Sequence, residues 1–190
     1  IFDDLRTEFK ETFPYKNISI RSVEADDIIA VLCKEHHQQE NILIISSDKD
    51  FQQLQIFDNV KQWSPLQKKF MECENPKMFL YEHIIRGDRS DGVPNILSDD
   101  DCLINQEKRQ KRITKKVISE LLEEVKTGDI KNRENWNRNN NMINLFELPD
   151  EVEDKILQEY RTEISGKRNK ILNYFITNKL SNLMEVIEDF

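Results

Sequence analysis

The stretch at residues 41–54 reads NILIISSDKDFQQL, and it decides the fold class. Its first six residues form a short, almost wholly apolar run, which is typical of a buried parallel strand. Two aspartates, Asp48 and Asp50, follow this run at once. In open α/β sheets, binding sites lie beyond the carboxyl ends of the strands. The stretch therefore predicts a polar site at the end of a parallel strand.

Helices and strands are predicted to alternate around this run. Helical spacing of apolar residues indicates helices at 1–13, 26–36, 51–54 and 77–86, and strands are expected at 18–20 and at 60–63, with a hairpin through 68–71. Beyond residue 76 we expect only helices and loops, with helices at 113–125, 150–161, 168–178 and 180–187 and a poorly patterned stretch at 131–142. The pattern predicts an α/β domain over residues 1–76 and a helical domain over residues 77–190.

The composition narrows the class of protein. Of the 190 residues, 37% are hydrophobic and 34% are charged, and no apolar run approaches the roughly 20 residues that a membrane span needs. Three widely spaced cysteines without a CxxC pair indicate a reduced cytosolic compartment and argue against a zinc site: Cys33, Cys73 and Cys102. The three histidines are interpreted as surface or boundary residues: His36, His37 and His83.

The formal net charge of −8 taken alone argues against nucleic-acid binding. The distribution of charge points the other way, because the basic residues gather in one block: Lys108, Arg109, Lys111, Arg112, Lys115 and Lys116. Acidic clusters apart from a basic block are typical of a metal site beside a phosphate-binding surface. An ordinary solvated helix face is the alternative explanation for the block.

Two acidic clusters flank predicted helices or strands. The first precedes an apolar helix and consists of Glu24, Asp26 and Asp27. Acids in a first helical turn stabilise the helix by roughly 0.3–1 kcal/mol each, so helix electrostatics is one explanation. The second cluster is Asp48 and Asp50, which in a strand-like segment would point the same way and reach one ion together. A polar turn is the alternative for this pair.

The third cluster lies in the loop GDRSDGVP at residues 87–94. Gly87 and Gly92 permit a tight loop, and one turn would place Asp88 and Asp91 side by side. A flexible acidic loop is the alternative. Taken together, seven carboxylates predict a hard cation, Mg²⁺ or Mn²⁺. Two such ions can activate a water molecule and stabilise the leaving oxygen of a phosphodiester.

The three motifs, in this order, resemble those of the 5′-nuclease (flap endonuclease) family, and the likeness is closest to the bacteriophage RNase H type. The matching segments are EADDIIA at 24–30, SSDKDFQQL at 46–54 and GDRSDGVP at 87–94. In the third segment Gly92 and Val93 replace an Asn and an Ile of the family pattern. The resemblance implies part of a PIN-like parallel-sheet catalytic domain, followed by a helical domain with a helix–turn–helix DNA-binding element.

The resemblance also implies roles for the acidic residues. Glu24 and Asp26 would hold the catalytic metal ion with Asp27 beside them, and Asp48 and Asp50 would lie between two ions. Asp88 and Asp91 would serve the second ion. The implied catalytic residues are thus Glu24, Asp26, Asp48 and Asp50, and the implied cofactor is two Mg²⁺ ions, with Mn²⁺ as an alternative. The implied reaction is attack by a metal-activated water on a phosphodiester near a 5′ end.

In the family, the third motif belongs to an element that grips duplex phosphates. The resemblance therefore assigns phosphate contacts to the glycine loop and to the basic block: Gly87, Gly92, Arg109, Lys111, Arg112, Lys115 and Lys116. Such contacts are independent of sequence and sensitive to salt. This chain departs from the family at residues 97–110, where the usual glycine-rich turn has no glycine.

The family places two further metal-binding aspartates and a basic arch upstream of the first motif. We expect that part to precede residue 1 in the complete protein, and we expect the chain alone to be weakly active or inactive. With that part present, the protein would be an active 5′–3′ exonuclease and flap endonuclease. The alternatives are a catalytically incomplete fragment that binds nucleic acid, and a helical adaptor whose acids are only surface charge.

The expected substrates are 5′ flaps and the RNA or DNA strands of a duplex, such as lagging-strand primers. A single-stranded DNA-binding protein and a sliding clamp are candidate partners of a monomeric protein without a membrane. A cytoplasmic location is expected, in the host cell if the protein comes from a phage. Two explanations stand for the apolar C-terminal residues, core packing or docking of a replication protein: Leu183, Ile187 and Phe190.

Overall fold

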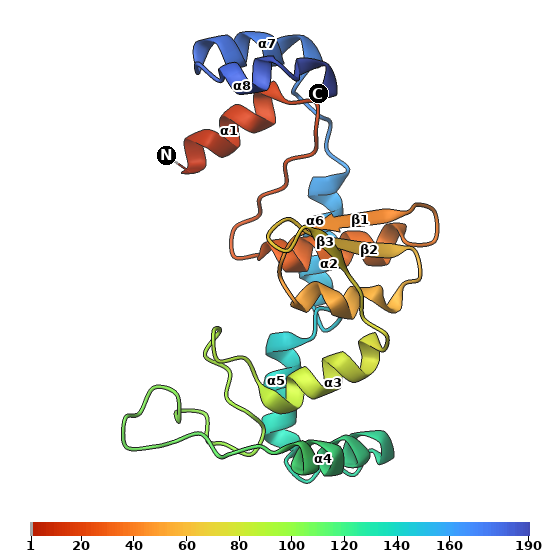
Figure 1. The fold of residues 1–190 in the computed structure, drawn as a ribbon, viewed down its shortest axis with the longest axis vertical. Helices are drawn as coiled ribbons and strands as arrows, with labels where there is room; N and C mark the ends of the chain where they lie inside the picture. The colour runs from red at the N-terminus through yellow and green to blue at the C-terminus, as the bar shows by residue number, and fades with distance from the viewer. Residues whose placement is uncertain (1) are drawn as a thin grey trace. The chain divides into compact units, whose positions relative to one another are not determined.

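The structure is a computed structural model that describes residues 2–190, and its contacts divide the chain into two compact units (Figure 1). The terminal unit contains the residues up to Ile28 and those from Asp150 to Phe190, and the central unit runs from Ile29 to Pro149. These units differ from the predicted domains 1–76 and 77–190, and the boundary between those domains stays a prediction. Ile1, where the first helix was expected to begin, lies outside the described residues.

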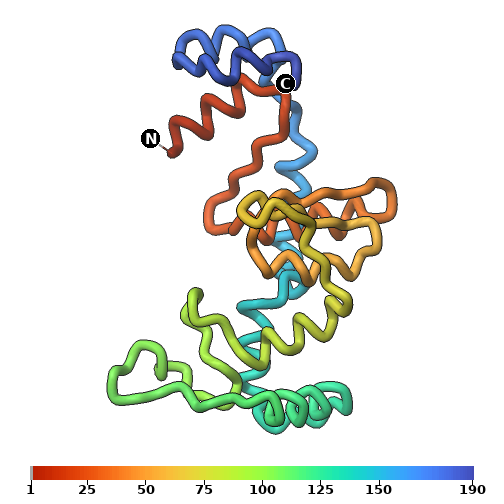
Figure 2. Tube along the Cα trace, viewed as in Figure 1, coloured from red at the N-terminus to blue at the C-terminus, as the bar shows by residue number. Residues whose placement is uncertain are grey.

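The terminal unit brings the two ends of the sequence together, as the paired red and blue segments of Figure 2 show. The Lys167 N–H donates to the Thr12 carbonyl at 3.2 Å. The Phe13 ring lies 6.2 Å from that of the fully buried Phe175 and 6.4 Å from that of Phe190, so the last residue packs into an aromatic cluster. The elements of this unit are α1 (Phe2–Thr12), α6 (Asp150–Tyr160), α7 (Arg168–Thr177), α8 (Ser181–Met184) and η2 (Ile187–Asp189).

The central unit contains a three-stranded sheet of β1 (Ile42–Ile45), β2 (Val60–Ser64) and β3 (Lys69–Met71) in that order. β1 and β2 are parallel with Ile42 opposite Val60, which confirms the predicted parallel strand. β2 and β3 are antiparallel with Trp63 opposite Phe70, which confirms the predicted hairpin.

One face of this sheet is covered by the helix α2 (Ala25–His36) and by the short 3₁₀ helix η1 (Asp50–Ile56), and together they form an apolar core. The buried members of this core are Ala30, Cys33, Ile44, Phe51, Leu54 and Val60. η1 contacts β2, and Asp50 is its first residue.

Two strand predictions are corrected by the structure. β1 was expected to be a buried strand, but Leu43 and Ile45 remain 53% and 68% exposed, because only the side that carries Ile44 packs on the core. The strand expected at 18–20 is wrong, since these residues are irregular in the structure and none of the described strands pairs with them. Alternation of apolar and polar residues gives a strand only where a neighbouring strand supplies ladder hydrogen bonds.

A second core joins the helices α3 (Pro76–Arg86), α4 (Lys115–Thr127) and α5 (Arg133–Ile143). Pro76 occupies the first turn of α3, and the Asn75 side chain accepts from the Met78 N–H at 3.0 Å. The Thr114 side chain caps α4, which therefore begins two residues after the expected start at Ile113. The buried residues of this core are Leu80, Ile84, Ile85, Val93, Ile96, Ile118, Leu121, Trp136 and Ile143.

The helix α5 was not predicted, because its buried face carries amides as well as apolar groups. Asn139 is fully buried, and its Nδ2 donates to the carbonyls of Ile84 and Pro94, each at 2.8 Å. Asn135 Nδ2 donates to the Ile96 carbonyl at 2.9 Å. Buried polar groups are tolerated when they are hydrogen-bonded. The amides of α5 thus hold the loop backbone that follows the third acidic motif.

The glycine that ends α3 is required by close packing. Gly87 has φ +68°, and a Cβ atom there would lie 2.4 Å from the Val93 carbonyl oxygen. Its N–H donates to the His83 carbonyl at 2.8 Å. The tight turn at Gly87 lets Asp88 fold back toward the helix.

No helix within residues 2–190 combines the length and the apolar character that a membrane crossing requires.

We predict that Gly87→Ala destabilises the central unit by more than about 2 kcal/mol, because the new methyl group clashes with backbone atoms. The control is Gly128→Ala, where φ is +78° but no atom lies within 4 Å of the position that the methyl group would take. There only the left-handed backbone costs energy, about 1–2 kcal/mol. Chemical denaturation measures both free energies of unfolding. Equal losses in the two variants would show that the close approach at Gly87 is unimportant.

Candidate metal centre

Three side chains of the central unit meet at one point: Asp50, His83 and Asp88. Each offers a ligand atom, and these atoms all lie within 4.8 Å of one another. Asp50 is the first residue of η1, His83 lies in the last turn of α3, and Asp88 follows the turn at Gly87. His83 and Asp88 are buried and Asp50 is half-buried. The second and third acidic motifs therefore converge in this group.

The Asp88 carboxylate is held by hydrogen bonds on both oxygens. Oδ2 accepts from Lys49 Nζ at 2.7 Å and lies 3.1 Å from His83 Nε2, and Oδ1 accepts from the Ser90 N–H at 2.9 Å and from the Ser90 hydroxyl. Although burial opposes ionisation, the hydrogen bonds from Lys49 and Ser90 hold the pKa of Asp88 well below its usual range. Since an ionised carboxylate only accepts, His83 Nε2 is the donor toward Asp88.

The contact between Asp50 and His83 is of another kind. Asp50 Oδ1 lies 3.4 Å from His83 Nδ1, yet both atoms are buried without a hydrogen-bond partner among the described residues. Burial raises the pKa of Asp50 to about 6, and the nearby His83 opposes this rise. A buried polar atom without a partner costs about 1–3 kcal/mol. A cation between the two atoms would satisfy both, so the residues fit a divalent metal ion.

Lys49 places a positive charge at this group. Its hydrogen bond with Asp88 raises the pKa of the Lys49 amine. The Lys49 side chain is 54% exposed, so its ammonium can turn toward solvent without disturbing the packed core. One lysine ammonium faces two aspartate carboxylates, so the charge balance of the group favours binding of a further cation.

Asp48 shapes the turn that leads into η1. Its Oδ1 accepts from the Asp50 N–H at 3.0 Å, and Lys49 between them has helical angles of φ −69° and ψ −24°. The extended geometry that was expected for residues 48–50 is therefore wrong. The Asp48 side chain instead accepts a hydrogen bond from the backbone two residues further on, which forms a turn. Fully buried Gln62 supports the turn, since its Nε2 donates to the carbonyls of Ser46 and Asp48 at 2.9 and 2.6 Å.

The group at Asp50, His83 and Asp88 contains none of the remaining predicted ligands. Asp91 is exposed and is not among the three ligands that lie within 4.8 Å of one another. Glu24, Asp26 and Asp27 lie at the start of α2 in the terminal unit, whereas the Asp50–His83–Asp88 group belongs wholly to the central unit. The Glu24 N–H donates to Asp27 Oδ2 at 3.1 Å, and burial raises the pKa of Asp27, with a smaller contribution from Asp26.

His83 is the residue whose role was not predicted from the sequence. Its interpretation as a surface or boundary histidine is wrong, because only 7% of the residue is exposed. The sequence feature that could have revealed this burial is the place of His83 on α3, three residues after buried Leu80 and next to buried Ile84. A histidine on the apolar stripe of a helix, five residues before an acidic loop, indicates a buried contact with that loop.

A basic hollow of about 320 Å³ lies beside α3 and ahead of α4. It is lined by Arg86, Arg89, Asn95, Gln110, Lys111, Arg112 and Ile113. The backbone of Lys111 is fixed here, because its carbonyl accepts from Asn95 Nδ2 and its N–H donates to Ser98 Oγ, both at 2.8 Å. Gln110 Oε1 is buried without a partner among the described residues.

The charges of the predicted phosphate contacts are only partly neutralised. Lys108 pairs with Asp101 at 2.7 Å, and Lys116 approaches Glu120 at 3.9 Å. Four basic side chains form no ion pair with any residue of the described chain: Arg109, Lys111, Arg112 and Lys115. The basic block thus leaves several charges for an anionic ligand. Whether these residues and the two loop glycines contact phosphate stays a prediction.

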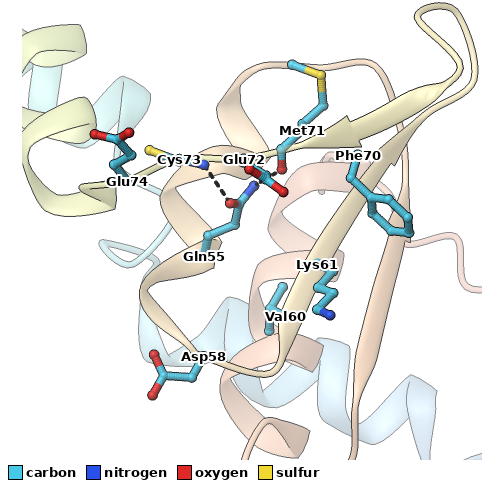
Figure 3. A pocket seen from close by; sticks show the side chains of 9 residues that line it. All are labelled: Gln55, Asp58, Val60, Lys61, Phe70, Met71, Glu72, Cys73 and Glu74. Atoms are coloured by element: carbon cyan, nitrogen blue, oxygen red, sulfur yellow. Dashed lines mark hydrogen bonds between the residues drawn. The ribbon is translucent and has the colours of Figure 1, made fainter.

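A second hollow of about 450 Å³ lies between η1 and β3 (Figure 3). Gln55 spans its base, where Nε2 donates to the Met71 carbonyl and Oε1 accepts from the Cys73 N–H, both at 2.9 Å. It carries three acidic side chains, Asp58, Glu72 and Glu74, but none of the predicted ligands. We therefore place the candidate metal centre at Asp50, His83 and Asp88.

Comparison with known proteins connects these motifs to a family of nucleases. Residues 74–190 match the family described as T4 RNase H, C terminal, and residues 4–82 match the 5′-3′ exonuclease, N-terminal resolvase-like domain. The chain is 32% identical to the ribonuclease H of Enterobacteria phage T4 in an alignment 192 residues long. The alignment covers 96% of this chain and 63% of that relative. It is also 35% identical to a 5′-3′ exonuclease of Buchnera aphidicola, over 45% of the chain and 33% of that relative.

Solved structures show the same fold. A mutant of T5 5′-exonuclease aligns with a TM-score of 0.55 at 21% identity, over 83% of this chain and 72% of that one. A bacteriophage T5 flap endonuclease, solved in a pseudo-enzyme–product complex with DNA and metal ions, aligns with a TM-score of 0.52 at 20% identity, over 85% and 66%. The chain thus spans about two thirds of the length of these relatives.

We predict that burial of Asp50 makes the metal-free chain less stable as the pH rises from about 4 to 6. With its pKa raised to about 6, the folded chain binds a proton that the unfolded chain has released, so stability falls across this window. Asp50→Asn removes this slope and stabilises the metal-free chain at pH 8 by on the order of 1–3 kcal/mol. Denaturation at several pH values in chelator tests this, and an unchanged slope in Asp50→Asn would contradict it.

Proposed function

The chain belongs to the T4 RNase H family, and from this premise we propose that it acts as a metal-dependent 5′–3′ exonuclease and flap endonuclease. One observation carries the proposal: Asp50 and Asp88, which lie 38 positions apart in the second and third motifs, meet in one group with His83. Two buried polar atoms of this group, Asp50 Oδ1 and His83 Nδ1, have no hydrogen-bond partner among the described residues. Buried carboxylates in such a group are stable when they hold a cation. The relatives that share the fold include enzymes solved with metal ions.

We propose the following division of the ligands. Glu24 and Asp26 would hold the catalytic ion with Asp27 beside them, and Asp48 and Asp50 would lie between two ions. Asp88 and Asp91 would serve the second ion, and the Lys49 ammonium, which pairs with Asp88 at 2.7 Å, would then have to leave this carboxylate. The cofactor would be two Mg²⁺ ions, with Mn²⁺ as the alternative. Such ions supply an activated water and stabilise the leaving oxygen of a phosphodiester.

The residues of this chain do the positioning. Asp48 holds the turn ahead of η1 and so aims Asp50 at the group. Hydrogen bonds from Lys49 and from the Ser90 side chain and backbone keep the Asp88 carboxylate ionised and oriented. Gln62 keeps the end of β1 fixed beneath them. A site built on rigid elements in this way keeps its ligands in place before the substrate arrives.

The proposed substrate is a DNA or RNA–DNA duplex with a 5′ end or flap, including RNA primers. The basic hollow and the basic block suit the phosphates of such a duplex: Arg86, Arg89, Arg109, Lys111, Arg112, Lys115 and Lys116. Arg86 now pairs with Glu82 at 2.6 Å and Lys116 with Glu120 at 3.9 Å, and phosphate would compete for both side chains. The loop glycines Gly87 and Gly92 would let backbone approach the same strand. We further propose a monomer in the cytoplasm, with a single-stranded DNA-binding protein or a sliding clamp as partner.

A second candidate function is nucleic-acid binding without cleavage. It is favoured by the coverage, because the chain spans only 63% of the T4 relative. The basic hollow lies wholly within the described chain, whereas the family pattern has further metal ligands upstream of the first motif. Binding of a 5′-flap duplex by the isolated chain without cleavage, together with cleavage by the complete protein, would assign this behaviour to the chain alone. A helical adaptor would show neither metal dependence nor duplex binding.

We predict that Asp48→Asn or Asp91→Asn lowers cleavage of a 5′-flap substrate by the complete protein by more than about 100-fold, because each removes a charge needed for the ions. The control is Asp58→Asn, an exposed aspartate on the wall of the second hollow. That variant should cleave at the normal rate. Undiminished cleavage by the Asp48→Asn variant would remove the catalytic assignment.

We predict that Arg112→Ala weakens duplex binding uniformly across sequences and lowers the slope of log K against log salt by about 1, since one phosphate contact is lost. The control is Lys126→Ala in the last turn of α4, which removes the same charge from a side chain already paired with Glu123. Fluorescence anisotropy at several salt concentrations measures both slopes. If the two variants have the same slope, the basic hollow is not a phosphate contact.

A further inference from the structure

The ligand set expected from the sequence consists of oxygen atoms alone, but the structure adds a nitrogen to it. His83 Nδ1 points at Asp50 Oδ1 across 3.4 Å, and neither atom has a hydrogen-bond partner among the described residues. His83 is 7% exposed, so water does not replace the missing partner freely. A buried nitrogen aimed at a carboxylate oxygen of the metal centre requires an explanation of its own.

The ring orientation sets which nitrogen faces Asp50. His83 Nε2 lies 3.1 Å from Asp88 Oδ2, and Asp88 is held in place by Ser90 and Lys49. The other ring nitrogen, Nδ1, therefore faces Asp50 Oδ1 across 3.4 Å. A cation coordinated by both atoms would supply the partner that neither atom has among the described residues.

The spacing suits a metal ion. Two ligand atoms that each lie about 2.0–2.2 Å from one ion are at most roughly 4.2 Å apart, and the observed 3.4 Å is within that limit. A histidine that donates one ring N–H to a carboxylate while the other nitrogen binds metal is a recurrent arrangement at metal sites. The charges agree as well, since two carboxylates face one lysine ammonium.

We propose that His83 Nδ1 is a ligand of the ion held by Asp50, and that this nitrogen makes the site prefer a transition-metal ion such as Mn²⁺ over Mg²⁺. Imidazole binds transition metals well, whereas Mg²⁺ strongly prefers oxygen ligands. Asp88, which the proposed function assigns to the second ion, also orients the His83 ring through its Oδ2. The inference rests on the proposed function in that it shares Asp50 and Asp88 with the nuclease site.

The test compares binding of Mn²⁺ and of Mg²⁺ to the 190-residue chain by calorimetry. The native chain should bind Mn²⁺ more tightly than Mg²⁺, and His83→Leu should lower Mn²⁺ affinity by about 10–100-fold while changing Mg²⁺ affinity little. His37→Leu is the control, because that ring stacks on Phe57 and lies outside the metal centre. An unchanged ratio of the two affinities in His83→Leu would overturn the proposal.

A spectroscopic measurement on the native chain removes dependence on a variant that fails to fold. Pulsed electron paramagnetic resonance of bound Mn²⁺ should detect a nitrogen nucleus coupled to the ion. The coupling should be lost in His83→Leu and kept in His37→Leu, and circular dichroism checks that each variant is folded. Absence of nitrogen coupling in the native chain would overturn the proposal.

The same experiments separate this inference from the proposed function. If nitrogen coupling and Mn²⁺ preference are found but the complete protein cleaves no 5′-flap substrate, the ligand assignment stands and the nuclease proposal fails. If the complete protein cleaves with Mg²⁺ as well as with Mn²⁺ and His83→Leu alters neither affinity nor spectrum, the nuclease proposal stands and His83 is only a packing residue.

Discussion

The facing pair of Asp50 Oδ1 and His83 Nδ1 constrains the rest of the central unit. Two buried polar atoms without a hydrogen-bond partner are costly, so the elements that carry them must be held firmly for the pair to persist. η1 carries Asp50 and packs on the sheet, while α3 carries His83 and packs on α4 and α5. A bound cation would give both atoms the partner that they lack among the described residues.

The surrounding loop keeps the site in this state. Gly87 ends α3 in a conformation that a larger residue cannot adopt beside Val93, and Asp88 turns back to hold His83. The amides of α5 then fix the backbone that leads away from Asp88, and Asn95 ties this backbone to Lys111. The acidic metal centre and the basic hollow are thus two ends of one hydrogen-bonded loop. The net charge of −8 does not indicate this separation, because it sums the acidic and basic groups over the whole chain.

Much of this arrangement could be predicted from sequence, since local patterns decide it. The run NILIIS predicted a parallel strand, and the Asp pair after it predicted the polar site, because both depend on residues that are neighbours in the chain. The exposed side of β1 could not be predicted, since apolar residues alone do not say which face another element covers. α5 was missed because Asn139 interrupts its apolar stripe, and its partners are carbonyls 45 or more positions away. His83 was missed for the same reason, as its contact with Asp50 joins residues 33 positions apart.

The most direct test of the account locates the ion itself. Crystals of the chain soaked in MnCl₂ should give an anomalous scattering peak between Asp50 Oδ1 and His83 Nδ1, with the Lys49 ammonium withdrawn from Asp88. Such a peak would place a divalent ion at the centre that these two buried atoms define. A structure in which Mn²⁺ occupies other sites while Asp50, His83 and Lys49 keep their present contacts would contradict the account.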